Sequence, residues 1–139
     1  MNSNKMLFIL SVSVSLFSFN YNAYADKFAN KIYTNNFYGT IGNLGVRMTL
    51  NINEKDNGNV GYTGYYSYNH VGKNIKINGY WLMRPGTPTY IELTEKAGGQ
   101  VTGSFSLLPK SYGDYSTLNG NWYSTNGKAL KVSLKNTKK

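Results

Sequence analysis

The chain contains no cysteine among its 139 residues, and it contains a single histidine. Disulfide bonds, thiolate metal sites and a Cys-His catalytic pair are therefore excluded. Carboxylates are also scarce, since six Asp and Glu residues stand against 15 Lys and Arg residues, which gives a formal net charge of +9. A chain of this composition has few groups that can exchange protons, and its excess positive charge favours an anionic partner.

No long hydrophobic run is present either. The most apolar segment, Met6–Phe19, is shorter than the roughly 20 residues that a membrane-spanning helix needs, and serines interrupt it. Lys5 precedes this segment and Ala23-Tyr24-Ala25 follows it, which is the pattern of a secretory signal peptide cleaved after residue 25. An uncleaved membrane anchor is the alternative. Position 26 is Asp, not the cysteine of a bacterial lipoprotein, so we expect a periplasmic or secreted protein with a charge of +8.

Beyond the leader, apolar and polar residues alternate along most of the chain, as they do in strands with one buried face. Turn signals such as Asp56–Asn59, Ala97–Gly99 and Asn126–Gly127 separate the alternating stretches. We expect a loosely ordered lead over 26–36, a single all-β domain over 37–135 and a basic tail over 136–139. The expected strands are 37–42, 46–53, 60–69, 74–83, 89–96, 100–108, 115–125 and 128–135.

Several strands contain a glycine followed two residues later by an aromatic residue, as in Gly64/Tyr66 and Gly103/Phe105. Both point to one face, so we expect the ring to cover the gap beside the glycine while the strand bends. Bent strands suit a closed sheet. The predicted fold is an eight-stranded antiparallel meander closing into a small barrel, and a two-sheet β-sandwich is the alternative.

The order of these motifs resembles a small all-β domain of bacterial exported proteins and lipoproteins. The resemblance rests on Phe37-Tyr38-Gly39-Thr40-Ile41-Gly42, on Val46-x-Met48-x-Leu50, and on the later Gly-Tyr-Tyr and Gly-x-Trp units. It covers nearly the whole mature chain and implies a barrel-like fold outside the cytoplasm. It implies no activity, and no functional residue follows from it.

The few groups that could perform catalysis are poorly placed for it. His70 lies in an expected turn and has no second histidine as a partner. Glu92 and Glu95 are three apart on a strand, so they point to opposite faces, and a pair between Glu95 and Asp114 is the remaining arrangement of carboxylates. We therefore predict that the protein is not an enzyme, and that it uses no metal and no cofactor.

Tyrosines and basic residues are better candidates for a binding site. Alternation places Tyr65 and Tyr80 on the face opposite the core, where they can contact a ligand or pack as cross-strand pairs. Tyr112 and Tyr115 flank a loop expected at 109–114. Because loops on a rigid scaffold often carry binding residues, the predicted binding residues include Arg84, in the loop 84–88, and Lys110. Inside the barrel, Tyr66, Trp81, Phe105 and Trp122 can line a cavity or fill it.

Five of the lysines lie in the last twelve residues. They either protect an edge strand against aggregation or contact an anionic partner.

Three functions are compatible with these features. The first is an exported binding module, such as a periplasmic inhibitor or immunity-type protein acting on an acidic partner protein. The second is a basic envelope-associated domain that binds anionic glycan, lipopolysaccharide or nucleic acid. The third is a carrier of a small hydrophobic ligand.

Overall fold

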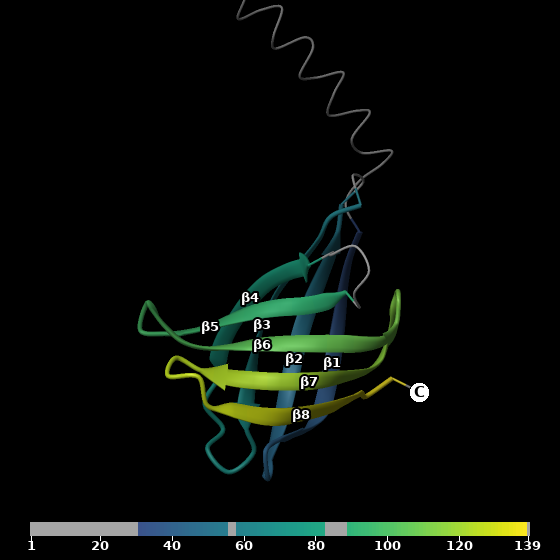
Figure 1. Ribbon diagram of the computed structural model, residues 1–139. Helices are drawn as coiled ribbons and strands as arrows, with labels where there is room; N and C mark the ends of the chain where they lie inside the picture. Colours follow the sequence, from purple (N-terminus) through teal and green to yellow (C-terminus); the bar gives the residue numbers. More distant parts are fainter. Residues whose placement is uncertain (1–30, 56–57, 83–88, 139) are drawn as a thin grey trace, which may run out of the picture. The chain divides into compact units, whose positions relative to one another are not determined.

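The computed structural model of the chain describes residues 31–55, 58–82 and 89–138. Each strand pairs antiparallel with the next one along the chain, and β1 pairs with β8, so the sheet closes into a barrel (Figure 1). This confirms the eight-stranded meander and excludes the two-sheet sandwich. The strands are β1 (Lys31–Ile41), β2 (Leu44–Glu54), β3 (Val60–Tyr68), β4 (Ile75–Leu82), β5 (Tyr90–Ala97), β6 (Gln100–Ser111), β7 (Asp114–Ser124) and β8 (Ala129–Asn136).

Alternating apolar residues fill the inside of this barrel. In β2 the inward side chains are at most 1% exposed, and they are those of Val46, Met48, Leu50 and Ile52. Among the interior aromatics, Tyr66 and Phe105 are fully buried and their rings meet edge to face at 5.2 Å. Trp81 and Trp122 are only partly buried and pack against the core from its margins. Every second side chain along a strand points inward, and because these side chains are mostly large and apolar they fill the barrel.

The inward glycines allow neighbouring strands to approach closely. A Cβ atom on Gly64 would lie 1.9 Å from the carbonyl oxygen of Thr49, and one on Gly79 would lie 1.8 Å from that of Glu92. At these positions the nearest atoms are backbone atoms of the adjacent strand, not atoms of the ring two residues later. At Gly103 a ring does cover the gap, but it is that of Trp122 on the neighbouring strand.

Three strands are longer than the sequence pattern indicated, and one of them is β2, which was expected over 46–53 and begins at Leu44. β1 begins at Lys31, so the second half of the expected loose lead, 31–36, is strand. Residues 31–36 pair with Thr49–Glu54 of β2. This pairing orders the segment, although its polar composition shows no strand pattern. β6 continues to Ser111, which reduces the expected loop 109–114 to a tight turn at Tyr112 and Gly113. Gly113 takes a φ of 76° there, which a glycine adopts without strain.

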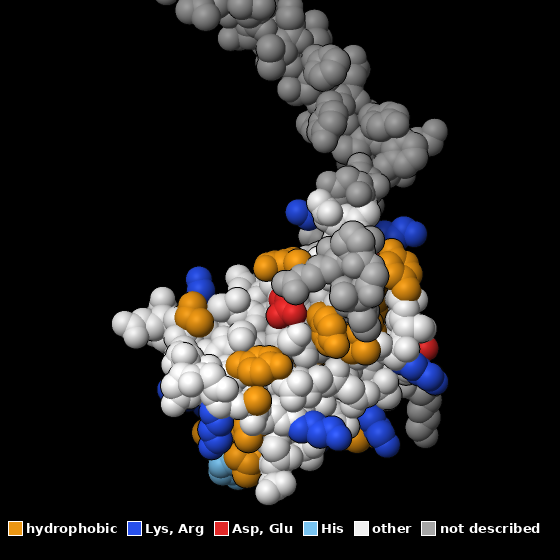
Figure 2. Space-filling view, viewed as in Figure 1, with side chains coloured by type: hydrophobic (Ala, Val, Ile, Leu, Met, Phe, Trp, Pro, Cys, Tyr) orange, Lys and Arg blue, Asp and Glu red, His pale blue; other side chains and the backbone are white. Residues whose placement is uncertain are grey.

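The lysines of β8 do not protect a free edge. β8 pairs with β7 on one side and with β1 on the other, so it is an interior strand of a closed sheet. Lys131 and Lys135 are exposed on the outer surface of the barrel instead. In Figure 2 Lys and Arg side chains gather along the β8 side of the face that β5–β8 form. Edge protection is thus wrong as an explanation, because closure removes the edge.

The closure is incomplete at one end of the barrel. β1 pairs with β8 only from Phe37 to Ile41, so Lys31–Asn36 extend past the last residue of β8. We call this end the mouth, because β2, β4 and β6 also end there, and we call the opposite end, which carries the β1–β2, β3–β4, β5–β6 and β7–β8 turns, the hairpin end. No helix in the described parts of the chain has the length and apolar character needed to cross a membrane.

Candidate functional site

The predicted binding residues separate into two groups. Tyr65 and Tyr80 lie on the outer surface, where they are 43% and 57% exposed. Tyr112 and Tyr115 lie at the mouth, near exposed Lys110, which sits at the end of β6. Arg84 falls outside the described residues. The outer surface and the mouth are therefore two separate candidate sites.

A shallow groove crosses the outer face of β2–β5. It consists of two adjoining pockets of about 450 and 420 Å³. Both pockets are lined by one row of cross-strand neighbours, in which Asn51 faces Thr63, Thr63 faces Asn78, and Asn78 faces Thr94. We call this surface the outer groove. Its floor is made of short, uncharged side chains that can donate and accept hydrogen bonds.

Positive charge and aromatic rings border this floor. Tyr65, Lys76 and Lys96 lie toward the hairpin end, and Lys55 and Tyr80 lie toward the mouth. Lys76 is directly opposite Lys96 in the β4–β5 ladder, and Tyr65 is directly opposite Lys76 in the β3–β4 ladder. Like charges facing each other across strands destabilise a sheet. Within the described part of the chain, neither Lys76 nor Lys96 has an ion-pair partner.

Hydrogen-bonding capacity remains available in the groove. Thr34 donates to the side-chain oxygen of Asn51 over 2.8 Å, which leaves the Asn51 amide nitrogen free to donate to a ligand. The side-chain oxygen of Asn53, in the mouth-side half, is buried and accepts no hydrogen bond from any described residue. A buried acceptor without a donor is unfavourable and uncommon in folded proteins. The groove thus combines unsatisfied polar groups with unpaired positive charge.

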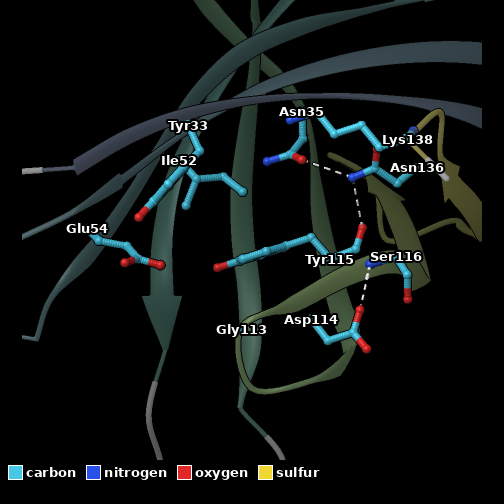
Figure 3. A pocket seen from close by; sticks show the side chains of 10 residues that line it. All are labelled: Tyr33, Asn35, Ile52, Glu54, Gly113, Asp114, Tyr115, Ser116, Asn136 and Lys138. Carbon is cyan, nitrogen blue, oxygen red and sulfur yellow. Dashed lines mark hydrogen bonds between the residues drawn. The ribbon is translucent and has the colours of Figure 1, made fainter.

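The second site is a pocket of about 580 Å³ at the mouth (Figure 3). It lies where β8 ends early, between the first residues of β1 and those of β7. Asn136 bridges the two sides, because its amide nitrogen donates to Asn35 over 2.9 Å and to the backbone oxygen of Tyr115 over 3.2 Å. We call this cavity the mouth pocket. It is lined by Tyr33, Asn35, Ile52, Glu54, Gly113, Asp114, Tyr115, Ser116, Asn136 and Lys138.

Tyrosines form the inner wall of the mouth. The hydroxyls of Tyr62 and Tyr115 lie 2.9 Å apart, and their rings meet edge to face. Burial raises the pKa of both hydroxyls above the ordinary tyrosine value, and the negative charge of nearby Glu54 raises both pKa values further. Farther out, Tyr112 is 81% exposed and its ring touches that of Trp81. Both expected tyrosines of this end therefore face accessible space.

The carboxylates and the histidine singled out in the sequence lie far apart where the structure describes them. Glu95 and Asp114 lie at opposite ends of the barrel, because Glu95 faces Gly103 of β6 and Asp114 faces Ser111. Eight residues of strand separate these positions by about 26 Å, so the Glu95–Asp114 pair does not form. His70 is exposed and lies beside the ring of Tyr68. Across the described ranges no three His, Asp or Glu side chains converge as metal ligands.

Glu95 instead belongs to a buried hydrogen-bond network. It is 4% exposed and accepts hydrogen bonds from the hydroxyl of Tyr66, from Thr102 over 2.7 Å and from the indole of Trp122 over 3.3 Å. Burial, together with the carboxylate, raises the pKa of Tyr66. The network ties β3, β5, β6 and β7 together at the hairpin end. The donors of the network all find their acceptor on Glu95. A buried network of this kind typically stabilises the fold.

Sequence reasoning missed Lys76, Lys96 and the floor of the outer groove. The alternation placed them on the outer face, but their mutual opposition depends on the β4–β5 register, and the long connection between those strands conceals it. It also missed Glu54, which lies one residue beyond the expected strand 46–53 but continues the inward phase of β2 into the mouth pocket. Comparison with protein-family models, with curated proteins and with solved structures finds no match.

Proposed function

We propose that the protein is a non-enzymatic binding module whose outer groove holds an acidic polysaccharide. The observation that carries the proposal is the opposition of Lys76 and Lys96 beside Tyr65, over a floor of Asn and Thr side chains. A ligand carboxylate or phosphate between the two ammonium groups would replace repulsion by charge-assisted hydrogen bonds. The expected signal peptide would place this groove outside the cytoplasm, where such polymers occur.

The rest of the groove supports a sugar ligand in particular. The exposed rings of Tyr65 and Tyr80 offer flat apolar surfaces with polar tips, against which the face of a sugar ring can pack. The free amide nitrogen of Asn51 and the hydroxyls of Thr63 and Thr94 can bond to sugar hydroxyls between those rings. Two pockets in series provide room for more than one sugar unit.

An inhibitor or immunity-type protein acting on an acidic partner protein draws less support. That function relied on two long loops as contact surfaces. One of them, 109–114, is mostly the end of β6 with a two-residue turn, and the other, 84–88, lies outside the described residues. The extended row of short polar side chains also lacks the central apolar anchor typical of a protein interface.

The test measures binding of the purified protein to polygalacturonate, with uncharged dextran as the neutral comparison. The double variant Lys76→Gln/Lys96→Gln is compared with Lys131→Gln/Lys135→Gln, which removes the same charge from the outer face of β8. We expect the groove variant to lose about tenfold or more in affinity, since it loses two charge-assisted contacts. The β8 variant should change less than about threefold, because exposed charges away from the ligand are screened by salt.

A matched aromatic pair tests the sugar contact. Tyr65→Ala should weaken the complex, while Tyr38→Ala should not, although Tyr38 is similarly exposed on the outer surface at 48% against 43%. Equal losses for both lysine pairs would mean that the polymer binds to general positive charge and would refute a groove site. Equal binding of dextran and polygalacturonate would refute the role of the ligand's negative charge.

A further inference from the structure

The mouth pocket has two chemically different ends. In Figure 3 the carboxylate of Glu54 and the hydroxyl ends of Tyr33 and Tyr115 point toward one part of the cavity, whereas Lys138 lies on the other side. At about 580 Å³ the cavity falls within the range of small-molecule sites. It shares no lining residue with the outer groove. A ligand of this pocket would therefore bind independently of the polysaccharide.

The Glu54 end is suited to a cation. No described residue forms a hydrogen bond or an ion pair with Glu54, although the chain carries a large excess of Lys and Arg. Figure 3 shows the carboxylate on the same side of the cavity as the rings of Tyr33 and Tyr115. A carboxylate next to tyrosine rings binds ammonium groups through a charge-assisted hydrogen bond and cation–π attraction.

The opposite end presents a hydrogen-bond donor that lacks an acceptor. Asn35 is 9% exposed, and its side-chain oxygen accepts the hydrogen bond from Asn136. Its amide nitrogen points into the cavity and has no acceptor among the described residues (Figure 3). This nitrogen is open to the cavity, so it is available to donate a hydrogen bond to a ligand. A carbonyl or carboxylate oxygen of a ligand would provide the missing partner.

We infer that the mouth pocket binds a small molecule that carries a protonated amine next to a carbonyl or carboxylate group. This is the chemistry of an amino acid or of the amino end of a peptide. The ammonium group would lie between Glu54 and the rings of Tyr33 and Tyr115. The neighbouring oxygen would accept the hydrogen bond of Asn35, and the side chain of the ligand would occupy the rest of the cavity.

The test uses phenylalanine amide as the probe and N-acetylphenylalanine amide as its uncharged counterpart. Binding is followed by NMR through the side-chain amide signals of Asn35, and a Kd of about 1 mM is expected for a ligand of this size. Glu54→Gln should weaken binding of the amine about tenfold or more. Glu92→Gln is the matched control, because Glu92 is an outer-face carboxylate bonded to Ser106, and it should leave binding unchanged.

Failure of phenylalanine amide to shift the Asn35 signals at about 10 mM, far above the expected Kd, would overturn the inference. Equal binding of the acetylated probe, or an unchanged affinity in a Glu54→Gln protein that melts normally, would overturn it as well. A comparison of free phenylalanine with phenylalanyl-alanine then distinguishes the sources. Tighter binding of the dipeptide identifies the amino end of a peptide, and the reverse order identifies a free amino acid.

Discussion

The carboxylate of Glu95 should hold the hairpin end of the barrel together, and its replacement by leucine tests this role. The substitution keeps a similar volume but removes the acceptor of three hydrogen bonds. Thr102 is exposed and can turn to water, whereas Tyr66 is 1% exposed and Trp122 is partly buried. The Tyr66 hydroxyl then keeps only the neighbouring hydroxyl of Tyr68. A buried hydroxyl that loses its main acceptor costs about 1–3 kcal/mol, and the indole N–H adds up to about 1 kcal/mol.

We therefore expect Glu95→Leu to lower the free energy of unfolding by about 2–3 kcal/mol. For a domain of about 100 residues this corresponds to a fall in Tm of roughly 10–20 °C. The assay is urea denaturation followed by tryptophan fluorescence, with calorimetry for Tm. Glu92→Leu is the control, since its carboxylate lies on the outer face and contacts Ser106 over 2.8 Å, and it should cost less than about 1 kcal/mol.

A double-mutant cycle separates the lost acceptor of the hydroxyl from a loss of packing. Adding Tyr66→Phe to Glu95→Leu removes both partners of the hydrogen bond, which is close to neutral when shape is conserved. The double variant should therefore recover about 1–2 kcal/mol relative to Glu95→Leu. If Glu95→Leu unfolds at the same urea concentration as the original protein, or if Tyr66→Phe brings no recovery, the network does not stabilise the barrel in the way described.

Two further predictions concern strand packing and pH. Gly79→Ala should lower the free energy of unfolding by about 2–4 kcal/mol in urea titrations, because its Cβ would meet a backbone oxygen at 1.8 Å. Gly61→Ala, with nothing within 4 Å, should change it by less than about 1 kcal/mol, and equal effects would contradict the close strand approach. Burial raises the pKa of Tyr62, Tyr66 and Tyr115 in the folded state, so the unfolded chain loses these protons first. Stability should be retained below about pH 10 and should fall above it by about 1.4 kcal/mol per pH unit for each tyrosine, and a constant urea midpoint up to about pH 11 would contradict this.

The sequence alone determined the class of fold and most of the strands. Alternation depends only on neighbouring residues, so Val46–Ile52 could be assigned to a buried face without knowledge of any partner strand. The turn dipeptide Asn126–Gly127 likewise acts through local φ and ψ angles. The first residues of β1 escaped prediction because their inward side chains, Tyr33 and Asn35, line a polar mouth instead of an apolar core. Where the inward face of a strand is lined by polar residues, the alternation of apolar and polar side chains that indicates a strand is lost.

Only the tertiary structure decided closure and the composition of both sites. The pairing of β1 with β8 joins residues about a hundred positions apart, and a period of two is the same in a barrel and in a sandwich. The opposition of Lys76 and Lys96 depends on the register between two strands, since a slip of one residue would turn each side chain to the other face. The mouth pocket exists because Lys31–Asn36 of β1 extend past the last residue of β8. No local pattern in the sequence encodes this difference in strand length. Local alternation thus specified which side chains face outward, and long-range register specified which of them meet.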